Sequence, residues 1–280
     1  MFLTGGIMAS IAVLILILIL VSDFIVGYIP FSWEQYLSEP FTKTDTTDSD
    51  KDDFTAIETY LQKMSDRIAI TQDLPEGMTI KIHYIDKDSV NAFATLGGHV
   101  FFYRGLLEKL PHENALTMVM AHEIAHIKYR HPIHSLGRGI LVGLTLSVIS
   151  SSAGDAIMDG FLNEAGILTV LKFGRDMERE SDKEAVNSLV ALYGHMKGGD
   201  DLFKVLQQQN KNSEPYEFFS THPLTDNRIS SIRQQSDQHP ASEAATITPL
   251  PEAFSDWVTS KKTEQIPLPE QNNKTKLQLQ

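Results

Sequence analysis

Two histidines four residues apart, His122 and His126, flank a glutamate, Glu123, within a stretch of helical periodicity. Residues four apart lie one above the other on a helix face, so both imidazoles can bind a single Zn²⁺. The glutamate directly after the first histidine can then act as the general base of a hydrolysis reaction. The alternative is a core helix whose histidines face solvent or a polar neighbour. The segment therefore predicts one helix and, on it, half of a metal site.

Residues 111–131 have the spacing of a helix with one buried face. The apolar positions that recur at this spacing are Leu116, Val119, Met120, Ile124 and Ile127. Pro111 suits the first turn of a helix, whereas Pro132 disfavours helical backbone at the residue before it. We therefore expect a helix that begins near Pro111 and ends near His131.

A catalytic zinc needs a third protein ligand, and residues 175–194 offer a carboxylate in a suitable setting. Ala185 and Leu189 mark the apolar face of a second predicted helix, which ends at a glycine. Glu178 and Asp182 share this face, where a carboxylate is costly unless it meets a cation or a metal. We predict Glu178 as the third metal ligand and Asp182 as the group that orients a zinc histidine through its free ring N–H. An ordinary charged surface helix is the alternative.

The order and spacing of these motifs resemble those of the M48 zinc metallopeptidases of the gluzincin type, the group of the CAAX-prenyl protease, HtpX and BepA-like enzymes. His122-Glu123-x-x-His126 is followed by Glu178-x-x-x-Asp182, as in that family. Residues 91–101 resemble its strand-and-glycine segment, and residues 220–229 resemble its late His-Pro and Arg-Ile signature.

The likeness extends over residues 54–233. It implies a mainly helical fold with a small β-sheet, the α+β arrangement of a zincin-like metallopeptidase domain. It also implies one Zn²⁺ per subunit, bound by His122, His126 and Glu178, with Glu123 as the catalytic base. No other cofactor is implied.

Residues 91–102 alternate weakly and are rich in Phe and Val, which predicts a strand pair broken at Gly97-Gly98. In the family, an edge strand beside the zinc binds the substrate backbone in extended form, by strand addition. The resemblance therefore implies that this segment binds a polypeptide substrate. The candidate substrate-binding residues are Asn91, Ala92, Gly97 and Gly98. An interior strand with a glycine bulge is the alternative.

His222 lies between an aromatic run and Pro223, on a predicted loop that leads into a helix from Thr225. In BepA-like enzymes the matching histidine lies near the zinc. This implies a catalytic role for His222, at the open position of the metal or beside the oxyanion. A lone loop histidine is otherwise usually solvated or hydrogen-bonded. His131 and His134, just after the zinc helix, are expected at the surface.

Residues 7–21 form an apolar run that extends, if Asp23 is tolerated, through Phe31, and the longer stretch is long enough to span a bilayer. We predict a single N-terminal transmembrane helix, with a cleaved signal peptide as the alternative. No Lys or Arg follows this run before Lys43, which favours translocation of the body. In a Gram-negative bacterium the catalytic domain would then lie at the periplasmic face of the inner membrane.

The composition divides the chain into four parts. Residues 1–31 are the predicted anchor, 32–53 a juxtamembrane segment with an acidic linker, 54–235 the metallopeptidase domain and 236–280 a flexible tail rich in Pro and Gln. A second apolar stretch, residues 139–157, carries serines and an aspartate and makes a poor spanning helix. We expect it to form a helical hairpin over the active site or at the membrane surface.

Charge and composition narrow the range of partners. The formal net charge of −12 argues against nucleic acid, and the lack of cysteine decides little about the compartment. The sequence therefore predicts a membrane-anchored zinc endopeptidase. Its predicted substrates are unfolded or misassembled envelope proteins in quality control, and a regulatory protein partner would restrain it. The alternatives are a catalytically silent holdase or adaptor of the same fold, and a metal-dependent hydrolase of a non-peptide substrate.

Overall fold

The computed structural model describes residues 2–42, 51–149, 173–209, 218, 221–223 and 226–264. The chain divides into two units, residues 1–249 and residues 250–280. Most of the predicted acidic linker, the second half of the predicted hairpin and the end of the tail lie outside the described residues.

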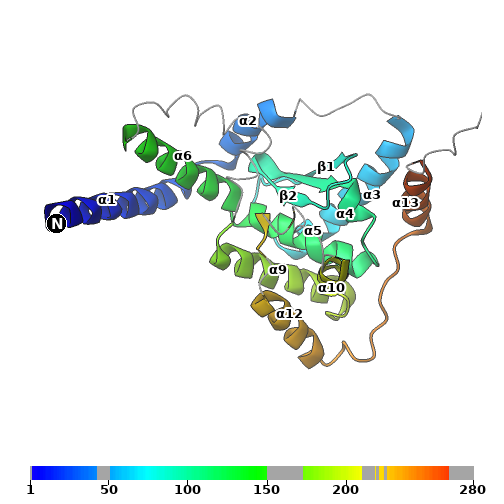
Figure 1. Ribbon diagram of the computed structural model, residues 1–280. Coiled ribbons are helices and arrows are strands. Elements are labelled where there is room, and N and C mark those ends of the chain that lie inside the picture. Colours follow the sequence, from blue (N-terminus) through cyan, green and yellow to red (C-terminus); the bar gives the residue numbers. More distant parts are fainter. Residues whose placement is uncertain are drawn as a thin grey trace, which may run out of the picture. The chain divides into compact units, whose positions relative to one another are not determined.

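A three-stranded sheet forms from β1 (Lys81–Ile85), β2 (Ala92–Ala94) and β3 (His99–Tyr103), in the order β1-β3-β2 (Figure 1). β3 is parallel to β1 and antiparallel to β2, which leaves β2 at one edge of the described sheet. The short helix η1 (Leu96–Gly98) joins β2 to β3, and Gly97 and Gly98 have φ angles of 73° and 86°. Glycine adopts such angles without steric cost. The predicted strand pair, broken at Gly97-Gly98, is therefore present.

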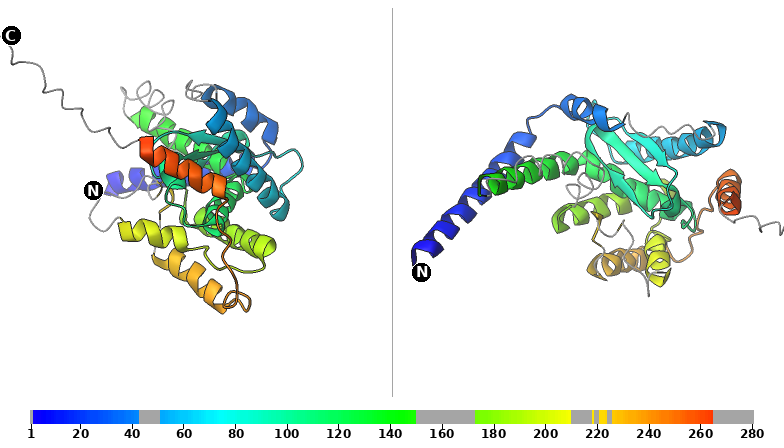
Figure 2. Two further views of the ribbon diagram at one scale, coloured as in Figure 1. Left: turned by 90° about the vertical axis from the view of Figure 1, so that its right-hand side faces the viewer. Right: turned by 45° about the horizontal axis from the view of Figure 1, so that its top comes forward.

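Three long helices pack with the sheet around one core. α5 (Glu113–Lys128) contacts β2 and α9 (Arg175–Tyr193), and α3 (Lys51–Thr71) packs against both helices and against β1 (Figures 1 and 2). The core includes the buried side chains of Leu61, Ile68, Val100, Phe102, Leu116, Met120, Ile124 and Leu189. Burial of each such side chain contributes about 1.5–3 kcal/mol, so the apolar face of α5 fixes that helix firmly. The predicted mainly helical fold with a small sheet is confirmed.

α5 ends earlier than the sequence predicts. Tyr129 caps its C-terminus, Arg130 takes a positive φ of 58°, and α6 (His131–Ile149) begins at the next residue. The prediction that the helix runs to His131 was wrong because Pro132 belongs to the first turn of α6, where the N–H that proline lacks has no helical partner in any case.

The N-terminal helix packs along α6. α1 (Phe2–Val26) and α6 run side by side (Figure 2), and α2 (Phe31–Thr42) follows α1 in the chain. Arg138 of α6 pairs with Asp23 of α1 at 2.7 Å. The described part of the apolar stretch 139–157, residues 139–149, is therefore one helix that lies along α1. Residues 150–157 lie outside the described residues, so the hairpin over the active site or at the membrane surface stays a prediction.

Arg130 connects the N-terminal helices to the end of α5. Its guanidinium donates hydrogen bonds to the carbonyl oxygens of Val26 at 3.2 Å and Ile29 at 2.6 Å. It also pairs with the buried carboxylate of Glu34, on α2, at 2.6 Å. The cation stabilises the carboxyl end of α1, as expected from the helix dipole.

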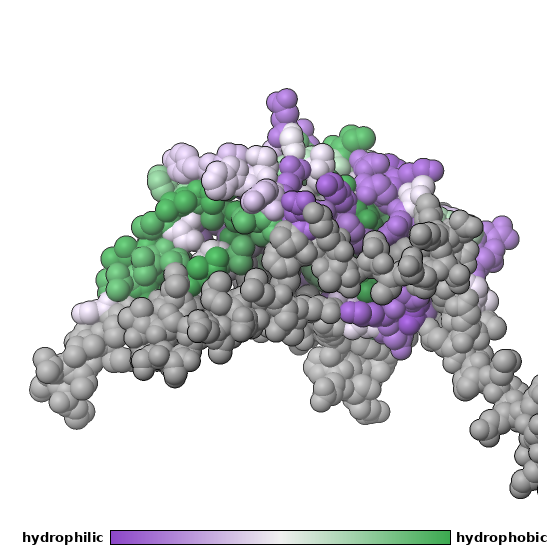
Figure 3. Space-filling model, turned by 90° about the horizontal axis from the view of Figure 1, so that it is seen from above, coloured by the Kyte–Doolittle hydropathy of each residue, from purple (hydrophilic) through white to green (hydrophobic). Residues whose placement is uncertain are grey.

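Much of the apolar surface of α1 remains exposed. Its large exposed side chains are Val13, Leu14, Leu16, Ile17, Leu20, Val21, Phe24 and Ile25. Figure 3 shows apolar surface, in green, gathered on the left of the view. Within the described ranges no single helix is both long and apolar enough to cross a membrane. The segments Val13–Val26 and Phe31–Glu39, bent by 102° relative to each other, meet that requirement only as a pair.

The remaining described helices of the first unit are α4 (Arg104–Leu107), α10 (Asp201–Gln209) and α12 (Asp226–Gln238). Residues after α12 stay attached to this unit, because Thr248 N–H donates to Asn114 Oδ1 at 2.9 Å. The unit thus runs to Pro249, and the end of the metallopeptidase domain at residue 235 stays a prediction. In the second unit the structure describes α13 (Glu252–Glu264).

Candidate metal centre

Four side chains that can bind a metal meet where α5 and α9 pack together. His122, His126, Glu178 and His222 each offer one ligand atom, and these atoms all lie within 4.8 Å of one another. The Nε2 atoms of His122 and His126 are 3.0 Å apart, as the four-residue spacing predicts. Glu178 Oε1 lies 3.5 Å from His126 Nε2 and 3.1 Å from His222 Nδ1. All four residues are buried.

The donor set fits a zinc ion. His122 Nδ1 lies 3.0 Å from Asp182 Oδ1. Because a carboxylate only accepts, that nitrogen carries a ring proton, and Nε2 is the atom that a metal would bind. His126 Nδ1 is engaged in the same way, 2.9 Å from Nδ1 of His131. Two imidazole lone pairs and a carboxylate that face one another in a buried space need a cation between them. Two histidines and a glutamate are a known ligand set of catalytic zinc.

The electrostatics of the cluster also favour a cation. Burial disfavours a charge on His122, but hydrogen bonds to Asp182 and Glu178 raise its pKa to about 9. Burial, together with the charge on His122, holds the pKa of His126 well below its usual value. Burial alone would raise the pKa of Glu178, yet the adjacent His222 and His122 hold it well below its usual value. The site therefore keeps its carboxylate ionised and attracts one positive charge, as a metal site must.

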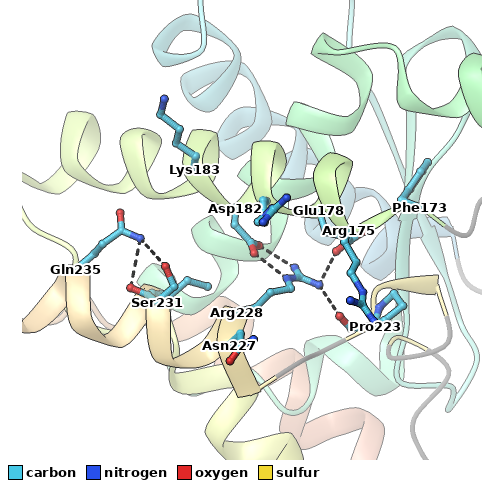
Figure 4. A pocket seen from close by; sticks show the side chains of 12 residues that line it. Phe173, Arg175, Glu178, Asp182, Lys183, Pro223, Asn227, Arg228, Ser231 and Gln235 are labelled. Carbon is cyan, nitrogen blue, oxygen red and sulfur yellow. Dashed lines mark hydrogen bonds and ion pairs between the residues drawn. The ribbon is translucent and has the colours of Figure 1, made fainter. Parts of the chain in front are cut away.

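A buried ion pair lies behind His122. The guanidinium of Arg228, on α12, donates two hydrogen bonds of 2.7 Å to Asp182 (Figure 4). It also reaches Glu178 Oε2 at 2.5 Å and the carbonyl of Pro223 at 3.0 Å. Burial would raise the pKa of Asp182, but the hydrogen bonds from Arg228 and His122 hold it below its usual value. Sequence reasoning assigned no role to Arg228, although it lies in the His-Pro and Arg-Ile stretch singled out above.

A second histidine lies behind His126. His131, predicted at the surface, is only 3% exposed, because α6 begins there and turns the imidazole back under the end of α5. Burial lowers the pKa of His131 to about 4, so the ring is neutral and can accept a hydrogen bond from the N–H at His126 Nδ1. Its other nitrogen lies 3.3 Å from Glu180 Oε2. Phe173 stacks on His126, with ring centroids 3.9 Å apart.

Glu123 lies beside the cluster and is fully buried. The backbone N–H of Ala94, in β2, donates a hydrogen bond to this carboxylate. The nearest basic group is His222, whose Nε2 lies 3.2 Å from Glu123 Oε1. Burial raises the pKa of Glu123 above its usual value, which suits a group that must take up and release a proton. The structure thus brings Glu123 and His222 together at the cluster, while their catalytic roles stay predictions.

The candidate substrate-binding residues have different settings. Asn91 and Ala92 lead into the edge strand β2, and neither side-chain amide atom of Asn91 has a partner among the described residues. Gly97 and Gly98 are covered: a Cβ at Gly97 would lie 2.5 Å from Ser38 Oγ, and one at Gly98 1.9 Å from a main-chain oxygen. The lack of a side chain at these two glycines allows close packing against α2 and the residues before β1, and their assignment to substrate binding stays a prediction.

Comparison with known proteins supports this description. Residues 55–236 match the protein family described as Peptidase family M48, which confirms the resemblance drawn from the motifs. The chain is 31% identical over 172 residues to the "Beta-barrel assembly-enhancing protease" of Escherichia coli (strain K12), a match that covers 55% of this chain and 34% of that protein. The protein of the same name from Yersinia pestis is 29% identical over 182 residues, 58% of this chain and 36% of that protein.

A mitochondrial relative is also similar. The "Mitochondrial metalloendopeptidase OMA1" of Saccharomyces cerevisiae is 26% identical over 176 residues, which cover 59% of this chain and 49% of that protein. In each of these comparisons the match spans half or less of the relative, and about a third of the bacterial proteins.

Proposed function

The chain belongs to peptidase family M48, and on that basis we propose that it is a membrane-associated zinc endopeptidase that cleaves unfolded or misassembled envelope proteins. The observation that carries the proposal is the buried cluster. Four ligand atoms lie within 4.8 Å of one another, beside the fully buried carboxylate of Glu123.

The metal would be held by His122, His126 and Glu178, with His222 adjacent to all three. Zinc in such a site supplies Lewis acidity, which polarises the scissile carbonyl and makes water a better nucleophile. The chain supplies the orientation of the ligands. Asp182 fixes the ring of His122 through Nδ1, and His131 fixes the ring of His126 in the same way.

Proton transfer is the task of Glu123. Its carboxylate takes the proton of the attacking water and delivers it to the leaving amine. The raised pKa of this buried carboxyl group allows it to hold the proton between the two steps. His222 Nε2 lies 3.2 Å from Glu123 Oε1, and in this proposal it would donate to the oxyanion that develops on the substrate.

The substrate would bind along the edge of the sheet. β2 pairs with β3 on one side, so its other side can add an extended polypeptide strand, with Asn91 and Ala92 at its start. Strand addition uses the backbone, which suits unfolded chains of many sequences. The names of the bacterial relatives connect those proteins with β-barrel assembly. We extend to this chain a role in quality control of envelope proteins, with a regulatory protein partner of unknown identity.

The exposed apolar side chains of α1 support association with a membrane. In this proposal residues 1–31 form a single-pass anchor, 32–53 a juxtamembrane segment and linker, and 54–235 the catalytic domain. The lack of Lys and Arg between the apolar run and Lys43 favours a catalytic domain on the periplasmic side of a bacterial inner membrane.

Cleavage of casein by the full chain, with and without a chelator, tests the proposal. We expect chelation to abolish cleavage. Glu123→Gln should fold and retain zinc by elemental analysis, yet lose about 10²–10⁴ in rate, because that is the range that general acid–base catalysis contributes.

Activity that survives in Glu123→Gln would contradict the assignment of the base. Binding of casein without cleavage by the wild-type chain would instead support the alternative, a catalytically silent holdase or adaptor of the same fold.

A further inference from the structure

A groove with a volume of about 580 Å³ runs between α9 and α12, next to the metal centre (Figure 4). Glu178 and Asp182 form part of its floor, so the groove borders the cluster directly. Arg228 crosses the floor and joins these two carboxylates. A polypeptide bound at the metal centre could therefore also contact this groove.

The wall contributed by α9 is cationic. Arg175, Arg179 and Lys183 line the groove at intervals of four residues, the spacing of one helix face. Of these three, only Arg179 has an ion-pair partner among the described residues, Asp176 at the exposed rim of α9. The protein as a whole carries a formal net charge of −12. This wall is therefore locally positive on a protein that is negatively charged overall.

Two of the carboxylates of α9, Glu180 and Glu184, are bound outside the groove. Glu184, one residue after Lys183, accepts hydrogen bonds from Lys128 Nζ at 2.8 Å and Tyr129 Oη at 3.0 Å, both from the end of α5. Glu180 reaches His131. Glu180 and Glu184 thus lie towards α5, whereas Glu178 and Asp182 lie in the groove, where Arg228 pairs with both.

The facing wall carries no compensating charge in the described part of the groove. α12 presents Asn227, Ser231 and Gln235, again at intervals of four residues. These are neutral side chains that can donate and accept hydrogen bonds. The groove therefore combines one positive wall with one hydrogen-bonding wall, a combination that suits an anionic polymer with a polar backbone.

We propose that this groove binds an acidic stretch of the substrate polypeptide, next to the bond that is cleaved. The inference rests on the proposed peptidase function. Four residues of helix span about 6 Å, and two residues of extended chain span about 6.6 Å. Carboxylates at every second position of an extended peptide therefore match the cations along α9. Guanidinium groups pair especially well with carboxylates.

Binding to the full-length chain in detergent micelles, in the presence of zinc, tests the inference without catalysis if Glu123→Gln is the background. Three fluorescent peptides share one central sequence and carry Glu, Gln or Lys at alternate flanking positions. We expect the Glu peptide to bind about fivefold more tightly than the Gln peptide, since each exposed ion pair contributes little, and the Lys peptide to bind more weakly than both. The difference should shrink at high salt.

Arg175→Glu/Lys183→Glu, in the same background, should reverse the order of the Glu and Lys peptides. Lys63→Glu/Lys81→Glu is the matched control, because it makes the same change of charge at exposed lysines outside the groove and should keep the wild-type order. Equal affinity for the three peptides would overturn the inference, as would an unchanged order in the groove variant. If the wild-type chain cleaves none of the peptides while the order of affinity holds, the peptidase proposal fails and the groove stands.

Discussion

The two histidines of α5 are oriented by different chemistry. His122 is backed by Asp182 and Arg228, an ion pair that is almost fully buried, whereas His126 is backed by a neutral imidazole, His131. Behind His131 lies Glu180, whose side chain is half exposed. Both histidines can bind the metal through Nε2. His122 is oriented by a buried ion pair, whereas His126 is oriented by a chain of hydrogen bonds that ends at the surface.

This difference predicts how substitutions behind each histidine affect stability and metal binding. A buried charge that loses its partner costs about 3–5 kcal/mol, because nothing replaces the missing ion. A neutral hydrogen bond contributes about 0.5–1.5 kcal/mol net. The support of His122 should therefore be indispensable to folding as well as to metal binding, and the support of His126 should affect mainly the metal.

The largest expected effect follows from removal of the buried cation. Arg228→Met leaves Asp182 and Glu178 without their guanidinium, so we expect the free energy of unfolding to fall by about 3–5 kcal/mol. Chemical denaturation of the zinc-free chain measures it. Arg233→Met, on the same helix, removes a half-exposed arginine paired with Asp200 and should cost less than about 1 kcal/mol. Equal losses in the two variants would show that the buried pair is not special.

The second-largest effect is expected from removal of the negative charge of Asp182. Asp182→Asn keeps the shape and can still accept the proton of His122 Nδ1, but it loses the negative charge that makes the imidazole a stronger ligand. We expect zinc affinity to fall by about 10–100-fold, measured by competition with a chromophoric chelator. Asp201→Asn is the matched control, since Asp201 pairs with His112 at 3.0 Å, away from the metal. A similar loss of affinity there would contradict the role given to Asp182.

The corresponding change behind His126 should have a smaller effect. His131→Leu removes the acceptor of the His126 Nδ1 proton, and we expect zinc affinity to fall by about tenfold, the lower end of the range for such partners. His131→Gln should recover part of the loss, because its amide oxygen can accept the same proton. His195→Leu changes a buried histidine outside the cluster and should leave zinc affinity unchanged. A larger effect than that of Asp182→Asn would invert the comparison.

The helices that carry the cluster follow from local pattern in the sequence. α5 and α9 are predicted by apolar residues at helical spacing, and the same spacing places Glu178 and Asp182 on one face. The end of α5 was misplaced, because a proline after a helix can equally begin the next one. β1 (Lys81–Ile85) was not predicted, since five residues that include a lysine and a histidine give a weak pattern and their parallel partner, β3, is distant in sequence.

The partners behind the ligands depend on how helices cross, which local pattern does not encode. His131 reaches His126 only because the chain turns at Arg130 and starts α6 in a new direction. Arg228 reaches Asp182 only because α12 crosses α9 at that point. A sequence motif can single out the stretch that contains Arg228, but the contact itself is set by the packing of these two helices.

The stability of the folded chain should depend on pH through His131, the hydrogen-bond partner of His126. Burial lowers the pKa of His131 in the folded chain to about 4, against about 6.5 in an unfolded chain. Between these values the unfolded chain binds a proton that the folded chain does not, so stability falls as the pH is lowered from about 6.5 to 4. In the presence of a chelator, His131→Leu should lose less stability over this window than the wild type, measured as the change in Tm. The Tm of each at pH 8 sets the baseline, and parallel slopes would contradict the prediction.

The smallest effect is expected at the exposed end of the chain of hydrogen bonds behind His126. Glu180→Gln keeps an oxygen that can accept from His131 Nε2, and the side chain is 50% exposed, so water can replace whatever the amide loses. We expect zinc affinity to stay within about twofold of the wild type, because a half-exposed ion pair contributes little. The corresponding change from carboxylate to amide at Asp182 is expected to lower zinc affinity far more. If the two losses of zinc affinity were equal, the support of His126 would depend on charge as much as that of His122, and a neutral chain of hydrogen bonds would be the wrong description of this side of the site.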